Sequence, residues 1–559
     1  MSAEEPSRRL NWIKNGRSIG LSILFSISLL ALVLVPIARW FLFEVDHQFA
    51  NLAGAGLSLI SAAFGFAGLW LRFARTRLQH LAFAIVPIAL AGSTLAVFEY
   101  VGVTGETVPV FRMRSWLSKS PRAKEMFSKE KLQSTPKLDR AAMRFRSSQF
   151  RGNARDGVMQ NDEFSVAWKE RLPKVLWRKS IGAGWASFAV GDGLAITLEQ
   201  MDEQECITAL ELTTGDVHWR IALPGKHLHA IGGVGPRSTP TIHQAKVLAQ
   251  TATGIVLCAD LESGEVIWQK DLLQLAGIDQ ATSEKDIAWG RSGSPLVVDK
   301  QVVVPFGGKR EDPNIKSLIA LDLGTGDVLW TGGESQIAYA SPMLLTLSGV
   351  RQIVSVNEGC ATGHNPANGD VLWTTPWPSK SNGDACASQP VAIDDSRILL
   401  GKGYALGSKL FETVYTGETP DNAYDKAFWQ TKTIWNNTRI LKTKFTSAIS
   451  YKGALYGLSD GILECVDPSD GSRIWRGKRY GQGQAIIVND HVLVSAEDGR
   501  IALISIQDGT SIAEMQVLDA ITWNVPAVAG PYLLMRNSEE VVCLLSERDA
   551  ERNDESVSP

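Results

Sequence analysis

The chain has 559 residues, of which 45% are hydrophobic, so it is long enough to form more than one structural unit. Its formal net charge is -3 at pH 7, which argues against a surface that binds nucleic acid or another polyanion. The hydrophobic residues are unevenly distributed, because three long uncharged runs fall near the N-terminus.

These three apolar runs occupy residues 18–38, 49–71 and 81–98. Each approaches the ~20 residues that an α-helix needs to cross a bilayer. A cleaved signal peptide is an alternative for the first run, and a buried helical hairpin for the other two. The first run, however, is too long and lacks a small-residue cleavage site. The sequence therefore predicts three transmembrane helices, at about 18–40, 49–72 and 79–102, in a membrane region that spans 18–103.

Basic residues around these runs predict their orientation. Four precede the first run and three separate the second from the third: Arg8, Arg9, Lys14, Arg17, Arg72, Arg75 and Arg77. Only Arg39 lies between the first and second runs. Because Lys and Arg are enriched in cytoplasmic flanks, we expect residues 1–17 to be cytoplasmic and everything after residue 103 to lie outside the cytoplasm.

Two polar segments flank the remaining sequence. Residues 104–149 are rich in Lys, Arg and Ser and predict a basic linker with some helix; contact with lipid headgroups is the alternative. Residues 549–559 are charged and nearly devoid of apolar side chains, which predicts a disordered tail. A folded domain over 150–548 remains.

A short motif recurs within this domain. Five segments, TTGDVHW, ESGEVIW, GTGDVLW, ANGDVLW and SDGSRIW, place a glycine four residues before a tryptophan. The glycines are Gly215, Gly264, Gly326, Gly369 and Gly471, and the tryptophans are Trp219, Trp268, Trp330, Trp373 and Trp475. Glycine suits a turn with positive φ, and the flanking runs are short and β-branched or alternating. Each copy therefore predicts a strand, a turn and a second strand.

The spacing of the tryptophans predicts the architecture. The first three steps are 49, 62 and 43 residues, and a weaker copy ending at Trp435 divides the long last step. Periods of roughly 40–50 residues with about four strands each are typical of propeller blades. We expect the tryptophan to fill the gap between neighbouring blades.

The two ends of the domain predict how the ring closes. Residues 521–546 supply three strands without a fourth, whereas residues 173–182 carry Trp177 without three strands before it. Pairing these segments would remove two exposed sheet edges. The predicted fold is therefore all-β, an eight-bladed propeller whose last blade is shared between the termini.

The G-[D/E]-x-x-W ending, after an ALDxxTG-like strand, resembles the repeat of pyrroloquinoline-quinone-type propellers. These occur in quinoprotein dehydrogenases and in BamB, the propeller lipoprotein of outer-membrane β-barrel assembly. The resemblance covers about residues 150–548, and FRGNARDGV at 150–158 is similar to a lead-in before some bacterial propellers of this type. It implies the fold more strongly than the function, because one fold hosts many functions.

Resemblance to the dehydrogenases would imply pyrroloquinoline quinone with Ca²⁺, a Glu and an Asn that bind the ion, a catalytic Asp and commonly a vicinal cysteine pair. No Cys-Cys occurs in the sequence. We therefore expect no cofactor, no metal and no catalytic residue. The favoured interpretation is a multi-pass protein of a bacterial inner membrane whose periplasmic propeller is a scaffold for another envelope or membrane protein. The alternative is a quinone-dependent membrane dehydrogenase that passes electrons to the quinone pool.

Candidate binding residues gather before the predicted innermost strands. Arg237 and Arg291 occupy the same place in successive units, so both are expected to point toward one mouth of the channel. Alternatively, each caps loop carbonyls in its own blade. Trp289 lies in a long loop on the same face. His227 and His229 could form a metal pair, but no Cys, Asp or Glu follows at ligand spacing, so a polar loop is favoured.

Overall fold

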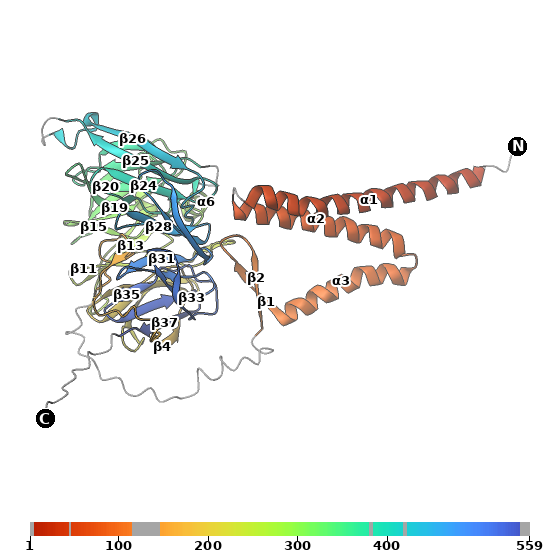
Figure 1. Ribbon diagram of the computed structural model, residues 1–559, viewed down its shortest axis with the longest axis horizontal. Helices are drawn as coiled ribbons and strands as arrows, with labels where there is room; N and C mark the ends of the chain where they lie inside the picture. Colours follow the sequence, from red (N-terminus) through yellow and green to blue (C-terminus); the bar gives the residue numbers. More distant parts are fainter. Residues whose placement is uncertain (1–4, 44–45, 115–145, 380–383, 418–421, 548–559) are drawn as a thin grey trace, which may run out of the picture. The chain divides into compact units, whose positions relative to one another are not determined.

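The computed structural model describes residues 5–43, 46–114, 146–379, 384–417 and 422–547. The chain folds as two compact units, Met1–Ser134 and Thr135–Pro559 (Figure 1). The predicted C-terminal tail and most of the predicted basic linker lie outside the described residues.

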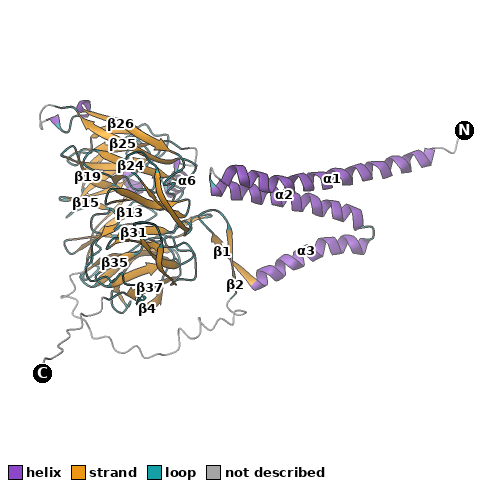
Figure 2. Ribbon diagram, in the orientation of Figure 1, coloured by secondary structure: helices purple, strands orange, loops and turns teal. Residues whose placement is uncertain are grey.

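In its described residues, 5–43 and 46–114, the first unit forms three long helices and one hairpin; Figure 2 shows these helices and the hairpin. The elements are α1 (Glu5–Phe43), α2 (His47–Phe73), α3 (Arg77–Val97), β1 (Phe98–Val103) and β2 (Pro109–Met113). Segments of all three helices are long and apolar enough to cross a membrane, as the sequence predicts: Ile19–Leu42, His47–Phe73 and Arg77–Val97. The third helix ends at Val97, and the chain continues as β1, which pairs antiparallel with β2.

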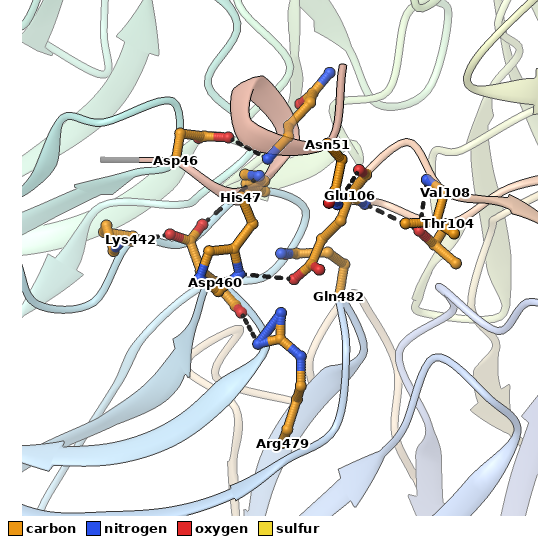
Figure 3. A network of polar contacts seen from close by, with 12 residues as sticks. Asp46, His47, Asn51, Thr104, Glu106, Val108, Lys442, Asp460, Arg479 and Gln482 are labelled. Atoms are coloured by element: carbon orange, nitrogen blue, oxygen red, sulfur yellow. Dashed lines mark hydrogen bonds and ion pairs between the residues drawn. The ribbon is translucent and has the colours of Figure 1, made fainter. Parts of the chain in front are cut away.

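Polar contacts fix the start of α2 (Figure 3). The Asp46 carboxylate accepts a hydrogen bond from the backbone N–H of Gln48 (2.7 Å), which satisfies one of the free donors of the first helical turn. Nδ1 of His47 lies 3.1 Å from Oε1 of Glu106, and the Asn51 amide donates to the Glu106 carbonyl at 3.0 Å. These two contacts attach the β1–β2 turn to the first turn of α2.

The second unit is an eight-bladed β-propeller, which confirms the predicted fold. Blade 1 consists of β5–β8 (Ala189–Gly191, Leu194–Met201, Gln204–Glu211, Val217–Pro224), and blade 2 of β11–β14 (Thr241–His243, Lys246–Gln250, Ile255–Asp260, Val266–Asp271). Blade 3 consists of β15–β18 (Leu296–Val298, Gln301–Pro305, Leu318–Asp322, Val328–Gly332), and blade 4 of β19–β22 (Met343–Leu347, Val350–Asn357, Cys360–His364, Val371–Pro376). Blade 5 consists of β23–β26 (Val391–Ala392, Arg397–Lys402, Gly407–Tyr415, Trp429–Asn437), and blade 6 of β27–β30 (Ile449–Tyr451, Ala454–Ser459, Ile462–Val466, Arg473–Arg479). Blade 7 consists of β31–β34 (Gln484–Val488, His491–Ser495, Arg500–Ser505, Ser511–Gln516). Blade 8 consists of β35–β37 (Ala527–Ala529, Tyr532–Arg536, Glu540–Leu545) and β4 (Lys174–Ser180).

Small elements join these blades. A short strand, β3 (Val158–Met159), adds to β31 in parallel. A small hairpin, whose strands β9 (Leu228–His229) and β10 (Gly233–Val234) have two residues each, precedes blade 2. Two short helices, α5 (Leu272–Ala276) and α6 (Gln280–Asp286), connect blades 2 and 3, and the 3-10 turn η4 (Lys426–Phe428) lies within blade 5.

The ring closes as predicted, by pairing of the two ends of the domain. Strand β4 lies antiparallel to β37, with Trp177 opposite Cys543. The last blade therefore takes three strands from the C-terminal end of the domain and one from its N-terminal end. Because β4 pairs with β37, the C-terminal strand of the domain is not left as an exposed sheet edge.

The repeated tryptophan joins each blade to the next. At six junctions its indole lies over the turn glycine of the following blade, where an added Cβ would come within 2.3 to 3.1 Å of the ring. The pairs are Trp177 on Gly215, Trp219 on Gly264, Trp268 on Gly326, Trp330 on Gly369, Trp435 on Gly471 and Trp475 on Gly509. Each indole N–H also donates, at 2.8 to 3.2 Å, to the carbonyl three residues before that glycine. The tryptophans therefore fill the gaps between blades.

The two remaining junctions differ because the next blade lacks the tight turn. Blade 5 connects its last two strands through residues 416–428, and Trp373 packs edge-on against Phe411 instead, with 5.5 Å between ring centroids. Blade 8 is interrupted at this point by the chain ends, and blade 7 has Ala513 in place of tryptophan. Ala513 packs against a buried apolar cluster that contains Trp168, from the segment before β4.

Replacing a turn glycine should reveal how much the indole contact contributes to the free energy of unfolding. Gly326 and Gly349 have similar left-handed φ angles of 73° and 77°, but only Gly326 is covered by an indole. Gly349→Ala should cost about 1 kcal/mol of unfolding free energy, from the backbone alone. Gly326→Ala should cost about 1–3 kcal/mol more, because the methyl group collides with Trp268. Chemical unfolding of the full-length protein followed by tryptophan fluorescence measures both, and equal losses would refute the proposed contact.

Closure of the ring is testable by hydrogen exchange. The amides of β4 should exchange as slowly as those of β37, since the two strands form one ladder. Trp177→Ala should speed exchange in both strands, whereas Trp219→Ala, which leaves β4 paired, should act mainly on blades 1 and 2. Fast exchange of β4 beside a protected β37 in the unaltered protein would contradict the closure.

Candidate functional site

A segment ahead of β4 occupies the centre of the propeller. We call residues 147–159 the channel plug. Its backbone contacts Val190 of blade 1 and Ile242 of blade 2, and its β3 pairs with β31 of blade 7. The FRGNARDGV motif makes a compact loop, with left-handed φ angles at four positions: Arg151, Gly152, Arg155 and Gly157. The chain thus folds back into its own channel.

Two buried arginines hold the channel plug in place. Arg151 donates to the Ala448 carbonyl of blade 6 (3.0 Å), and Arg155 donates to the carbonyls of Ser294 (3.0 Å) and Pro295 (2.8 Å) of blade 3. Burial lowers the pKa of Arg151 to about 10, partly opposed by Asp156, and that of Arg155 to about 9. Both groups remain charged at neutral pH, so their bonds tie nearly opposite blades together across the axis.

A cavity of about 130 Å³ lies where the blades enter their innermost strands, with Phe150 of the channel plug in its wall. We call it the mouth cavity. Every blade contributes to its lining, which carries six further aromatic side chains: Trp185, Trp289, Tyr339, Tyr404, Phe445 and Trp523. Small or polar residues fill the intervals, among them Ser292, Ala385, Ala387 and Gln484. The mouth cavity is therefore a largely apolar recess closed behind by the chain itself.

The aromatic rings pack on one another. The ring centroids of Trp185 and Trp523 are 4.6 Å apart, and those of Phe445 and Trp523 are 5.1 Å apart. The Trp185 indole donates to the Gly232 carbonyl (2.7 Å), and the Trp523 indole donates to Oε1 of Glu497 (2.8 Å). Both N–H groups are thus bonded to the protein, so what these indoles offer a ligand is mainly apolar ring surface.

Two cations line the mouth cavity. Arg237 donates to the carbonyls of Gly232 (2.7 Å) and Gly235 (3.1 Å), and burial lowers its pKa to about 10, so it stays charged at neutral pH. Lys444 lies 5.8 Å from the centroid of the Tyr404 ring and 3.6 Å from the carboxylate of Asp460. That carboxylate also pairs with Lys442 at 2.7 Å (Figure 3).

The structure places the other candidate residues as follows. Trp289 lines the mouth cavity and stacks on His229, with 4.2 Å between ring centroids. Nδ1 of His229 accepts from the backbone N–H of Gly232 at 3.1 Å. His227 is buried, and burial, with Arg237 and His229 nearby, lowers its pKa to about 3, which keeps it neutral. Arg291 is also buried and donates to the Phe306 carbonyl; it does not line the mouth cavity.

These positions do not gather metal ligands. The two histidines differ in their surroundings: His229 stacks on a tryptophan ring, whereas His227 is buried. Among the residues that the structure describes, no three His, Cys, Asp or Glu side chains form a group that could hold a metal ion.

Sequence inspection missed most of the aromatic lining, although a signal for it exists. In six blades the lining residue stands three positions before a proline or its equivalent at the start of the innermost strand: Arg237, Ser292, Tyr339, Ala387, Phe445 and Trp523. Trp185 has the same place before β5 of blade 1. Reading that single column across the repeats would have identified one wall residue for each of seven blades.

Pyrroloquinoline quinone with Ca²⁺ is the group that the wider propeller family suggests for such a mouth. Calcium is bound by oxygen ligands, mostly carboxylates and amide carbonyls. The described lining of the mouth cavity includes no Asp, Glu or Asn side chain, and its nearest cations would oppose a metal ion. All six cysteines are buried free thiols, and five of them belong to the third strands of different blades. The residues present do not fit this cofactor.

Comparison with known proteins gives BamB among the sequence relatives, and both BamB and quinohemoprotein alcohol dehydrogenases among structures of similar fold. The outer membrane protein assembly factor BamB of Shewanella oneidensis is 22% identical over 399 residues, which cover 59% of this chain and 99% of the relative. That of Moranella endobia is 27% identical over 153 residues, 27% of this chain and 34% of the relative, so the match spans about a third of its length. The crystal structure of BamB from Moraxella catarrhalis covers 67% of this chain and 99% of its own, with 13% identity and a TM-score of 0.47.

A family-wide comparison identifies the family. The family described as outer membrane protein assembly factor BamB matches residues 165–310 and 256–476, which together make up more than half of the chain. The matched region contains the tryptophan repeats of blades 1 to 6. The chain therefore belongs to the BamB family of pyrroloquinoline-quinone-like β-propeller repeat proteins.

Proposed function

We propose that this protein is a membrane-anchored, non-catalytic scaffold whose propeller binds another envelope or membrane protein at the mouth cavity. One observation carries the proposal: side chains from all eight blades converge on a single aromatic recess that the channel plug closes from behind. A recess of this kind holds part of a larger ligand but lets nothing pass through the ring.

The composition of the mouth cavity favours a protein ligand. Tryptophan, tyrosine and arginine are the residues most enriched at the energetic centres of protein interfaces. Here Trp185, Trp289 and Trp523 share one concave surface with Arg237. Trp185 and Trp523 are fixed by mutual packing and by bonded indole N–H groups, and Trp289 stacks on His229, so little side-chain entropy is lost when a partner binds.

The membrane region supports the location. Three candidate membrane-crossing helices precede the propeller. Basic residues concentrate before the first helix and between the second and third, which favours a cytoplasmic N-terminus and a periplasmic propeller on a bacterial inner membrane. This anchoring differs from the lipid anchor expected of a BamB-type protein.

The relatives support a role in envelope assembly. Both curated relatives carry the name outer membrane protein assembly factor, and one of them is matched over 99% of its length. We extend that role to this chain as an assembly partner held at the inner membrane. The binding partner is then another envelope protein, reached on the periplasmic side.

Site-directed photocrosslinking in native membranes tests the proposal. A photoreactive residue in place of Ile231, which is 42% exposed and adjoins Gly232 of the mouth cavity, should capture a membrane or envelope protein. The matched control replaces Ile474, which is 55% exposed on the outermost strand of blade 6. Trp289→Ala should reduce the yield from position 231 several-fold. Capture of the same protein from both positions, or insensitivity to Trp289→Ala, would refute binding at the mouth.

Cofactor addition tests the non-catalytic assignment separately. Purified full-length protein given pyrroloquinoline quinone and Ca²⁺ should show no bound chromophore and no alcohol- or sugar-dependent dye reduction, because the mouth cavity offers no carboxylate to the ion among its described residues. Turnover above a protein-free control would favour the quinone-dependent dehydrogenase instead.

A further inference from the structure

We infer that the mouth cavity receives one apolar side chain of phenylalanine size from an extended segment of a partner protein, with a carboxylate beside it in that segment. The inference rests on the proposed function and specifies the chemistry of the group that the partner inserts. Three properties of the mouth cavity lead to it: its size, its hydrogen bonding and its charge.

Size limits the occupant to a single ring. An engineered cavity of ~150 Å³ in another protein is known to bind benzene, so about 130 Å³ holds one phenyl group or one branched aliphatic side chain. Phe150 of the channel plug stands in the wall, and the plug's bonds to blades 3 and 6 keep it there. A longer ligand therefore inserts only one residue, and the rest of it lies over the rim.

Hydrogen bonding favours an apolar group. The main polar groups of the wall already have partners within the protein. Arg237 and the Trp185 indole bond to Gly232, and the Gln484 amide donates to the carbonyls of Phe445 (2.8 Å) and Trp523 (3.0 Å). A hydroxyl or amide that entered would lose bonds to water and meet engaged groups, whereas a phenyl ring loses nothing and packs edge to face with the aromatic wall.

Charge favours an acidic neighbour. Arg237 donates to neutral carbonyls, and within the described part of the chain it forms no ion pair. Lys444, by contrast, faces Asp460. Positive charge at the mouth repels cations, so the aromatic wall is unsuited to a quaternary ammonium or lysine ligand. A carboxylate next to the inserted side chain would meet the guanidinium at the rim, where partial burial strengthens their attraction.

Short synthetic peptides test this on the full-length protein in lipid nanodiscs. The probe is the capped hexapeptide Ser-Gly-Phe-Asp-Gly-Ser, and binding is followed by saturation-transfer NMR against empty nanodiscs. Replacing Phe by Ala in the peptide should weaken binding about tenfold or more, and replacing Phe by Tyr should also weaken it. Replacing Asp by Asn should weaken it about three- to tenfold at low salt, with a smaller effect at high salt.

Variants of the protein locate the effect. Ala387→Leu, in the wall, should fill the mouth cavity and reduce binding about tenfold, whereas Ala427→Leu, on the exposed η4 turn, should leave it unchanged. Arg237→Lys should keep the preference for Asp over Asn in the peptide, and Arg237→Gln should lose it. Unfolding temperatures close to that of the unaltered protein show that each variant is folded.

The outcomes separate this inference from the proposed function. Equal binding of the Asp and Asn peptides, or binding that survives Ala387→Leu in a folded variant, overturns the inference. If crosslinks from position 231 still depend on Trp289, the scaffold function stands and only the inserted group was misassigned. If the peptides behave as expected but position 231 captures no protein, the chemistry of the mouth cavity holds and the scaffold function fails.

Discussion

The propeller depends on one repeated contact, an indole ring lying over the turn glycine of the next blade. Since glycine has no Cβ, the ring can approach the backbone closely enough for its N–H to reach the carbonyl three residues earlier. A single side chain thus supplies apolar burial and a directional bond at the same junction. The bond orients the ring, and so each contact helps to set the angle at which one small sheet meets the next.

The architecture could be predicted from the sequence because the residues that make this contact recur in a short motif. The glycine, the tryptophan and the short strands around them fall within one repeat, so their spacing predicts a propeller, and the incomplete sets of strands at its two ends predict the shared last blade. The channel plug could not be predicted in the same way. Arg151 finds its acceptor 297 residues further along the chain, and no local pattern encodes that distance. Arg291 shows a similar limit. The sequence predicts the same place for Arg291 and Arg237, but Arg291 stands four residues before Pro295, whereas Arg237 stands three before Pro240, and the Arg291 side chain donates to Phe306 of its own blade.

Structural and functional positions are separated within each repeat. The glycine and tryptophan lie in the outer part of the blade and serve the junctions, whereas the residue before the innermost strand faces the axis. That axial position holds Arg237, Ser292, Tyr339, Ala387, Phe445 and Trp523 in different blades. Positions that face the axis can therefore differ in chemistry from blade to blade while the contacts that build the ring repeat.

The channel plug limits how far the blades can move apart. Arg151 and Arg155 of the channel plug bond to blades 6 and 3 on nearly opposite sides of the axis. These bonds oppose any movement of the two blades away from the axis. The width of the recess at the axis is then set during folding and not by whatever enters it. If the proposed binding occurs, a recess of fixed width would favour an occupant that already fits over one that is a methylene wider.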